Sequence, residues 1–280
     1  MGFIDLHVHS TASDGSLTPE ELVRYACEKG LYAFALTDHD SVAGIPAALR
    51  ESAKYPVHVI PGVEISAAIG GQSVHILGYN VNYEDPTFLH ALKVIHHFKD
   101  ERNIKMCAQL RSYGIDIDYE SFRSDNQIGC HFITRKLIAD YMLSKGYVSS
   151  IQEAFDKYLA KGKPCFIPTR AISANDAAKL IINAGGIPVL AHPIQYKLPD
   201  AGYKKLFALV ETFGIRGVEA VYSTNTHEEE LKFRKYAEEA GLFVTGGTDF
   251  HGYLKPNIDL GTGLGNLMIP QTMLENLIRK

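Results

Sequence analysis

The sequence predicts an α/β fold: a TIM-like barrel of about seven parallel strand units that carries a helical insertion. Two observations support this prediction. Short apolar runs alternate with helical segments at both ends of the chain, as in parallel α/β sheets. Residues 85–168 keep helical spacing with no strand-like run between their helices. We therefore expect residues 1–84 and 169–280 to form the barrel and residues 85–168 to form an inserted cap.

The first part of the chain gives four predicted strands and two helices. Thr18, Pro19 and Glu21 form a helix start with an N-cap, a proline at the first position and a capping-box glutamate. Gly70-Gly71 predicts a turn between the last two of these strands. The predicted strands are 4–8, 33–36, 57–60 and 74–77, and the helices are 18–30 and 45–49.

The insertion and the last part of the chain continue the pattern. Three helices are expected in the insertion, and Ser150 and Glu153 form the capping box of the third. Alternation then resumes until the chain nears its end. The predicted insertion helices are 89–114, 134–146 and 150–162, the later helices are 174–184, 206–213 and 227–240, and the later strands are 187–191, 217–221 and 243–245.

Composition and charge argue against several classes of protein. A net charge of -4 argues against a duplex nucleic-acid partner, and no apolar run is long enough to cross a membrane. The N-terminus does not have the succession of regions found in a signal peptide. The scattered cysteines are expected to be free thiols in the reducing cytoplasm: Cys27, Cys107, Cys130 and Cys165. The sequence does not indicate an oligomeric state.

Histidines and acidic residues follow the predicted strands, at the end of a barrel where active sites gather. His7 and His9 lie two apart on a strand and so point to one face. Imidazoles and carboxylates suit divalent Zn, Mn or Fe, and the set is large enough for two or three ions with Glu64 as a bridge. The candidate ligands are His7, His9, Asp14, His39, Glu64, His75, His192, Asp249 and His251.

Each candidate also has an ordinary structural interpretation. A single histidine at a strand end is usually a surface or core residue, and Asp14 before Gly15 is a normal turn pair. Asp40 is expected to N-cap the following helix, and Asp249 and His251 are also typical of a polar loop. The repetition at nearly every predicted strand favours the metal site. Five histidines outside strand ends are expected to be surface or supporting residues: His58, His90, His96, His97 and His131.

These residues occur in motifs that resemble the PHP (polymerase and histidinol phosphatase) domain family. The motifs are His7-Val8-His9-Ser10, Ser13-Asp14-Gly15, Leu36-Thr37-Asp38-His39-Asp40, Gly62-Val63-Glu64, Val74-His75-Ile76, Ala191-His192-Pro193 and Gly247-Thr248-Asp249-Phe250-His251. The resemblance implies a distorted seven-stranded barrel with a trinuclear centre, usually of manganese, iron or zinc. It also implies metal roles for all nine candidates, with Glu64 bridging.

The inserted helices resemble those of stand-alone members that include nucleoside 3′,5′-bisphosphate phosphatases and 5′-to-3′ oligoribonucleotide-degrading relatives. The expected activity is hydrolysis of a phosphate ester of a small nucleotide, by attack of a hydroxide that bridges two metals. A histidine beside the centre would protonate the leaving oxygen. The expected catalytic residues are His7, His9, Asp14, His39, Glu64, His192, Asp249 and His251.

Cations of the insertion are the candidates for substrate selection, because guanidinium and ammonium groups bind phosphate. They are Arg102, Lys105, Arg135 and Lys163. In the branch that this chain resembles, two arginines contact a second phosphate, and their positions match Arg102 and Arg135. A solvated helix face is the alternative interpretation. His227 is either a substrate residue, as the resemblance implies, or an ordinary first residue of a helix.

Three other functions fit part of the pattern. A histidinol-phosphate or other small phosphomonoester phosphatase shares the domain but needs no arginine for a second phosphate. An amidohydrolase-type enzyme would normally have a bridging lysine at a strand end, and none occurs here. A non-catalytic, metal-stabilised binding module would keep the ligands without turnover.

Overall fold

The fold is taken from a computed structural model, which describes residues 2–125, 133–168 and 170–278. The chain forms two compact units, residues 1–92 with 172–280 and residues 93–171. The predicted insertion, residues 85–168, overlaps the second unit, although the division falls inside helix α3 (Pro86–Ser112). The role of this insertion as a cap stays a prediction.

The first unit is a nearly closed barrel of seven strands, which confirms the predicted fold class. Hydrogen bonds continue the sheet beyond the last strand: Asp249 donates its backbone N–H to His7 O at 2.9 Å, and His9 donates to Phe250 O at 3.0 Å. The order is β1 (Phe3–Val8), β2 (Leu31–Leu36), β3 (His58–Ile69), β4 (Gln72–Tyr79), β6 (Ile187–Leu190), β7 (Gly217–Tyr222) and β8 (Phe243–Gly247), and β5 (Ile172–Ser173) pairs beside β3.

The expectation of an entirely parallel sheet is wrong. β4 runs antiparallel to both β3 and β6, whereas the other neighbours along the barrel are parallel. The cause is the Gly70-Gly71 turn, whose positive φ angles of 54° and 84° suit glycine and fold β3 back as a hairpin. Pairing across this hairpin extends β3 far beyond the predicted end at residue 60.

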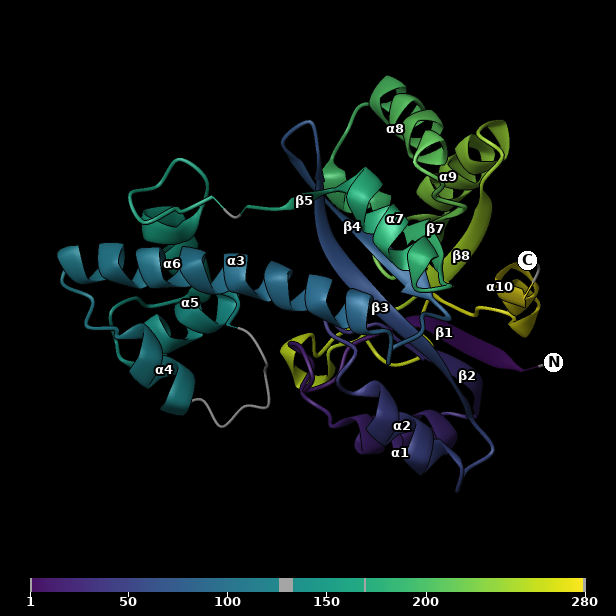
Figure 1. The fold of residues 1–280 in the computed structure, drawn as a ribbon, viewed down its shortest axis with the longest axis horizontal. Helices are drawn as coiled ribbons and strands as arrows, with labels where there is room; N and C mark the ends of the chain where they lie inside the picture. Colours follow the sequence, from purple (N-terminus) through teal and green to yellow (C-terminus); the bar gives the residue numbers. More distant parts are fainter. Residues whose placement is uncertain (1, 126–132, 169, 279–280) are drawn as a thin grey trace. The chain divides into compact units, whose positions relative to one another are not determined.

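Helices cover the outside of the barrel (Figure 1). The predicted start at Thr18 is confirmed, because Thr18 and Glu21 form a complete capping box. Helix α8 begins earlier than predicted, after Pro199. Figure 1 shows α1 beside α2 and α8 beside α9. The helices are α1 (Pro19–Glu28), α2 (Ile45–Ser52), α7 (Ala174–Asn183), α8 (Asp200–Thr212), α9 (His227–Glu239) and α10 (Glu275–Ile278).

Apolar side chains fill the barrel interior, and the C-terminal segment packs against them. Leu267, Ile269 and Leu277 join the same buried cluster as the strand residues Ile4 and Leu77. Ile4 also donates its backbone N–H to Ile269 O at 3.0 Å. A filled interior leaves the polar groups of the site at the barrel end that carries the loop after β1.

The second unit is helical and has its own core. Buried side chains from its helices pack together, among them Met106, Leu110, Ile138 and Met142. Helix α4 (Tyr119–Asp125) was not predicted, and the predicted third helix is α6 (Ile151–Ala154) followed by a π-helix (Phe155–Leu159). Helix α5 (Arg135–Ser144) lies where it was expected.

Two expectations concern the chain as a whole. No described helix is long and apolar enough to cross a membrane. Cys27, Cys107 and Cys165 are free, as predicted. Cys130 and His131 lie outside the described residues.

Candidate metal centre

All nine predicted ligands come together at one end of the barrel. β1 and the loop after it supply His7, His9 and Asp14, and the loop after β2 supplies His39. The loops after β6 and β8 supply the last three: His192, Asp249 and His251. Glu64 differs from the prediction, because it lies within β3 and not after the end of a strand, whereas His75 lies within β4 as predicted. The long antiparallel hairpin brings them to the site.

Glu64 lies at the centre of the cluster and is fully buried. Its Oε1 is 2.8 Å from His75 Nδ1 and 2.8 Å from His192 Nε2. Its Oε2 lies between 3.0 and 3.2 Å from ring nitrogens of three other histidines: His7, His9 and His39. The two oxygens therefore face two separate sets of imidazoles, which is the arrangement that a bridging carboxylate requires.

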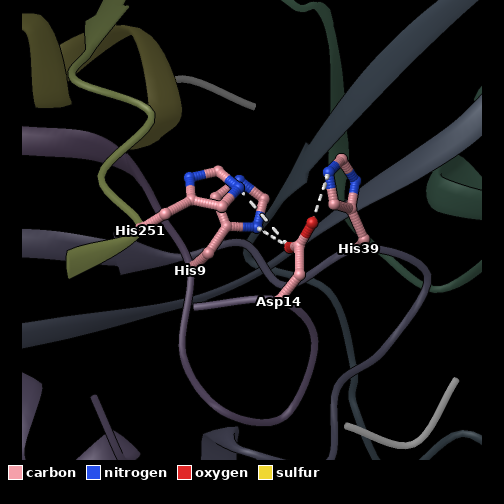
Figure 2. Close-up of side chains that lie close together, drawn as sticks. All are labelled: His9, Asp14, His39 and His251. Carbon is pink, nitrogen blue, oxygen red and sulfur yellow. Dashed lines mark ion pairs between the residues drawn. The ribbon is translucent and has the colours of Figure 1, made fainter. Parts of the chain in front are cut away.

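Asp14 organises a second part of the cluster (Figure 2). One oxygen, Oδ1, lies 3.4 Å from His251 Nε2 and 3.8 Å from His9 Nδ1, and Oδ2 lies 4.0 Å from His39 Nε2. Three groups of donors are close enough to hold an ion: His9, Asp14, His39 and His251; His7, His9 and Asp249; and His39, Glu64 and His75.

Second nitrogens of two rings are held by other groups. His7 Nδ1 donates to Glu219 Oε1 at 3.0 Å, and His251 Nδ1 donates to the carbonyl oxygen of Asp249 at 2.8 Å. Such hydrogen bonds orient each ring, so its Nε2 faces the cluster. Glu219 also accepts the backbone N–H of His192 at 2.8 Å and thus positions two candidate ligands.

The donor set fits divalent metal ions. Several of its atoms are buried without a hydrogen-bond partner among the described residues: His7 Nε2, His9 Nε2, Asp14 Oδ1, His39 Nδ1, Glu64 Oε2 and His192 Nδ1. A buried polar atom without a partner is costly, and an ion among these atoms would satisfy them. Nitrogen and oxygen donors without sulfur match manganese, iron or zinc.

Charges in the cluster are strongly coupled. Burial alone would raise the pKa of Glu64 and Asp249, but neighbouring imidazoles, and Lys255 beside Asp249, hold both pKa values well below the usual range. Burial lowers the pKa of His251 to about 4, with the charge of His9 adding to the effect. His251 is therefore neutral and Glu64 and Asp249 are ionised at pH 7, the states that bind metal.

Three residues at the site have positive φ although they are not glycine: Asp40 (49°), His192 (25°) and Asp249 (57°). Such backbone conformations are costly and persist where the surroundings enforce them. The prediction that Asp40 caps α2 is wrong, because Gly44 occupies that position without a side-chain bond. Asp40 instead accepts the backbone N–H and the hydroxyl of Ser66, each at 2.8 Å.

Several supporting residues were missed from the sequence. Asp38 belongs to a quoted motif but was given no role; it accepts both the backbone N–H and the hydroxyl of Ser10, at 2.8 and 2.7 Å. Of these residues, Glu219 is the one that its sequence surroundings mark, because it is an acidic residue inside an apolar strand. Tyr222 and Lys255 both donate to Asp249 Oδ2, at 2.7 and 2.6 Å. No local pattern marks these two residues.

Of the predicted substrate residues, Arg102 and Arg135 lie near each other in the second unit. Burial, together with the charge of Arg135, lowers the pKa of Arg102 to about 10. Arg135 stacks over the Phe166 ring at 4.6 Å and donates from Nη2 to Ile167 O at 3.1 Å, while its Nε is buried without a partner among the described residues. Two half-buried guanidiniums form a surrounding that favours an anion.

The other predicted substrate residues have less specific surroundings. Lys105 and Lys163 are exposed. His227 is the exposed first residue of α9, directly after the N-cap Thr226. Their assignments stay predictions.

Relatives with curated names cover most of the chain. It is 32% identical to a 3′,5′-nucleoside bisphosphate phosphatase of Chromobacterium violaceum, over 93% of this chain and 91% of that protein. Identity is 33% to a 5′-3′ exoribonuclease of Haemophilus influenzae, over 91% and 94% of the two chains. A phosphoribosyl 1,2-cyclic phosphate 1,2-diphosphodiesterase of Eggerthella lenta is 31% identical over 89% and 94%.

Solved structures and a family model agree with these relatives. A Chromobacterium violaceum protein described as an amidohydrolase has a TM-score of 0.84 at 31% identity, over 99% of this chain and 97% of that one. A Bifidobacterium adolescentis protein proposed to be a metal-dependent phosphoesterase also has a TM-score of 0.84, at 27% identity over 98% and 95%. The PHP domain model matches residues 5–248. With this match over most of its length and a cluster built from the predicted motifs, the chain belongs to the PHP domain family.

Proposed function

We propose that this chain is a metal-dependent phosphoesterase that hydrolyses a phosphate ester of a small nucleotide, either a nucleoside 3′,5′-bisphosphate or the 5′ end of a short RNA. The enzyme class, a hydrolase of phosphoester bonds, follows from the family and from relatives named as a phosphatase and an exoribonuclease. A cytoplasmic location fits the three free cysteines.

The observation that carries the proposal is the position of Glu64. One oxygen faces His75 and His192 and the other faces three further histidines, which supports a role for this carboxylate as a ligand that two ions would share. We assign two or three manganese, iron or zinc ions to the nine candidate ligands. When bound, such ions would activate water and neutralise charge that develops on the phosphoryl oxygens.

The residues of the chain supply the rest of the chemistry. Glu219 accepts a hydrogen bond from Nδ1 of the His7 ring. Asp38 accepts one from the backbone N–H of Ser10, at the start of the loop that carries Asp14. Rings held in this way lose little conformational entropy when a ligand binds. Protonation of the leaving oxygen would fall to a histidine of the cluster whose nitrogen faces outward.

Recognition of the nucleotide is assigned to Arg102 and Arg135. Burial lowers the pKa of both guanidinium groups, and the charge of Arg135 adds to this effect on Arg102. A phosphate would stabilise both charges through charge-assisted hydrogen bonds. A monophosphate needs no such second contact. This pair therefore favours a substrate with a phosphate besides the one that is cleaved.

A cyclic phosphodiester is a second candidate substrate. It is favoured by the similarity to the phosphoribosyl cyclic phosphate diphosphodiesterase of Eggerthella lenta, which is 31% identical over most of both chains. The same metal chemistry would open a cyclic phosphodiester. Separate assays on a cyclic ribose phosphate and on a nucleoside bisphosphate distinguish the two candidates.

The test is an assay of substrate hydrolysis by protein that has been loaded with Mn²⁺, Fe²⁺ or Zn²⁺. The panel contains nucleoside 3′,5′-bisphosphates, nucleoside monophosphates, histidinol phosphate, a cyclic ribose phosphate and short 5′-phosphorylated RNAs. We expect the highest kcat/KM for the bisphosphate or the RNA, and loss of turnover on chelation. Preferred hydrolysis of histidinol phosphate would contradict the substrate assignment. Metal-loaded protein that hydrolyses no member of the panel would favour the binding module.

A further inference from the structure

The two carboxylate oxygens of Asp249 have different surroundings. Oδ1 faces the cluster, 3.2 Å from His9 Nε2 and 3.4 Å from His251 Nδ1. Oδ2 points away and accepts two hydrogen bonds, from the Tyr222 hydroxyl at 2.7 Å and from Lys255 Nζ at 2.6 Å. One oxygen is thus occupied by the protein, and the other remains available to an ion.

Both donors are held in place from outside the cluster. Tyr222 ends β7 and is 2% exposed, and its hydroxyl also receives a hydrogen bond from Gln195 Nε2. Lys255 ends the short 3₁₀ helix Gly252–Leu254, with its backbone N–H donating to Gly252 O at 3.1 Å. Tyr222 belongs to a strand and Lys255 to a loop, so only the folded barrel brings both donors to one oxygen of Asp249.

We propose that Tyr222 and Lys255 are positioning residues that keep Asp249 a one-oxygen metal ligand. Turning the carboxylate so that both oxygens faced an ion would leave a buried phenol and an ammonium without their acceptor, which is costly. The pair also secures a residue whose φ of 57° is unfavourable for aspartate. This inference rests on the proposed function, since it takes Asp249 as a ligand.

The chain offers a matched control for both donors. Asp259 likewise receives a tyrosine and a lysine, Tyr25 at 2.6 Å and Lys29 at 2.6 Å, but it is not one of the cluster's donors. Removing the same chemical groups there changes the formal charge of the barrel by the same amount and likewise takes one donor from a carboxylate. Any effect confined to the Asp249 pair then reflects its position beside the metal ligands.

The experiment is calorimetric titration of Mn²⁺ into the full chain after removal of metal by chelation. We expect Tyr222→Phe and Lys255→Met each to weaken Mn²⁺ binding by about 10- to 100-fold, the range found when residues that orient ligands are removed. Lys255→Arg, which keeps a cationic donor, should recover most of the affinity. Tyr25→Phe and Lys29→Met should bind Mn²⁺ like the unaltered chain.

Each outcome decides the proposal. Unchanged affinity in both Asp249-pair variants would overturn it while leaving the metal centre intact. Equal weakening in the control pair would also overturn it, because the effect would then be a general one. An unaltered chain that binds no Mn²⁺ would overturn the proposed metal centre as well. Thermal unfolding of the metal-free variants checks that each one folds, and Lys255, whose side chain is 34% exposed, is the safer of the two sites.

Discussion

The metal-ligand cluster of the barrel and Arg135 of the second unit have different electrostatic surroundings. In the barrel, imidazoles and carboxylates lie within about 3 to 4 Å of one another, and outer atoms of several of them are held by further groups such as Glu219 and Lys255. In the second unit, Arg135 contacts a carbonyl oxygen and an aromatic ring, and no described carboxylate pairs with it. The first arrangement favours cations and the second an anion. A metal-dependent enzyme for a phosphorylated substrate needs both.

The largest effect is expected from the barrel cluster. Asp249→Ala or His192→Ala should lower metal-dependent turnover by about 100- to 1,000-fold, because each removes a group that would bind an ion beside the reacting phosphate. Turnover of the preferred panel substrate and metal content by mass spectrometry measure this. His58→Ala, an exposed histidine of β3 outside the cluster, is the control. Full activity in Asp249→Ala would show that the cluster is not the site.

Core substitutions test whether the two units are independent. Leu110→Ala in the second unit and Leu77→Ala in the barrel each leave a cavity in a fully buried cluster, at a cost of about 2 to 5 kcal/mol of unfolding free energy. Only Leu77→Ala should weaken Mn²⁺ binding, since that residue lies within β4, the strand that carries His75. Hydrogen exchange locates the destabilised unit. Weakened Mn²⁺ binding in Leu110→Ala would show that the core of the second unit also affects the metal centre.

Arg135→Ala should separate the roles of the two regions in catalysis. Loss of one guanidinium bond to a phosphate costs about 1.5 to 3 kcal/mol, so KM for the bisphosphate should rise by about 10- to 100-fold with little change in kcat. KM for a monophosphate should change far less. Steady-state kinetics on both substrates measure the difference. Arg111→Ala, an exposed arginine of α3 that pairs with Asp118, is the matched control.

The smallest effects concern helix caps. Thr18→Ala and Thr134→Ala each remove a side-chain acceptor at a helix start, at a cost of about 1 kcal/mol. Thr134 directly precedes Arg135, so its replacement should also raise KM for the bisphosphate, whereas Thr18→Ala should leave KM unchanged. Thermal unfolding and kinetics on the two variants test this pair. Equal KM values in the two variants would show that the N-cap of α5 does not affect substrate binding.

Sequence reasoning found the candidate ligands but misplaced one of them. It identified Glu64 by its motif and assigned it to the end of a strand, because an apolar run shows where a strand starts more clearly than how far pairing extends it. Glu219 was missed because its partner His7 lies 212 residues away along the chain. A contact between residues so far apart leaves no pattern in a short stretch of sequence.

Local chemistry, by contrast, was sufficient for several features. Thr18 and Glu21 define a helix start within four residues, and Gly70-Gly71 defines a turn within two. Helix α4 and the early start of α8 were missed, because helices there are stabilised by packing that weak local signals do not reveal.

The sequence by itself determined the donors, their chemistry and the alternation of strands and helices, since residue type and periodicity act over a few positions. Only the tertiary structure decided that β4 pairs with β6 as well as with β3, and that Tyr222 and Lys255 meet on one oxygen of Asp249. Pairing between distant strands and contacts between distant side chains depend on which segments bury one another when the barrel closes. That choice is made by the free energy of the whole domain, which no short stretch of sequence contains.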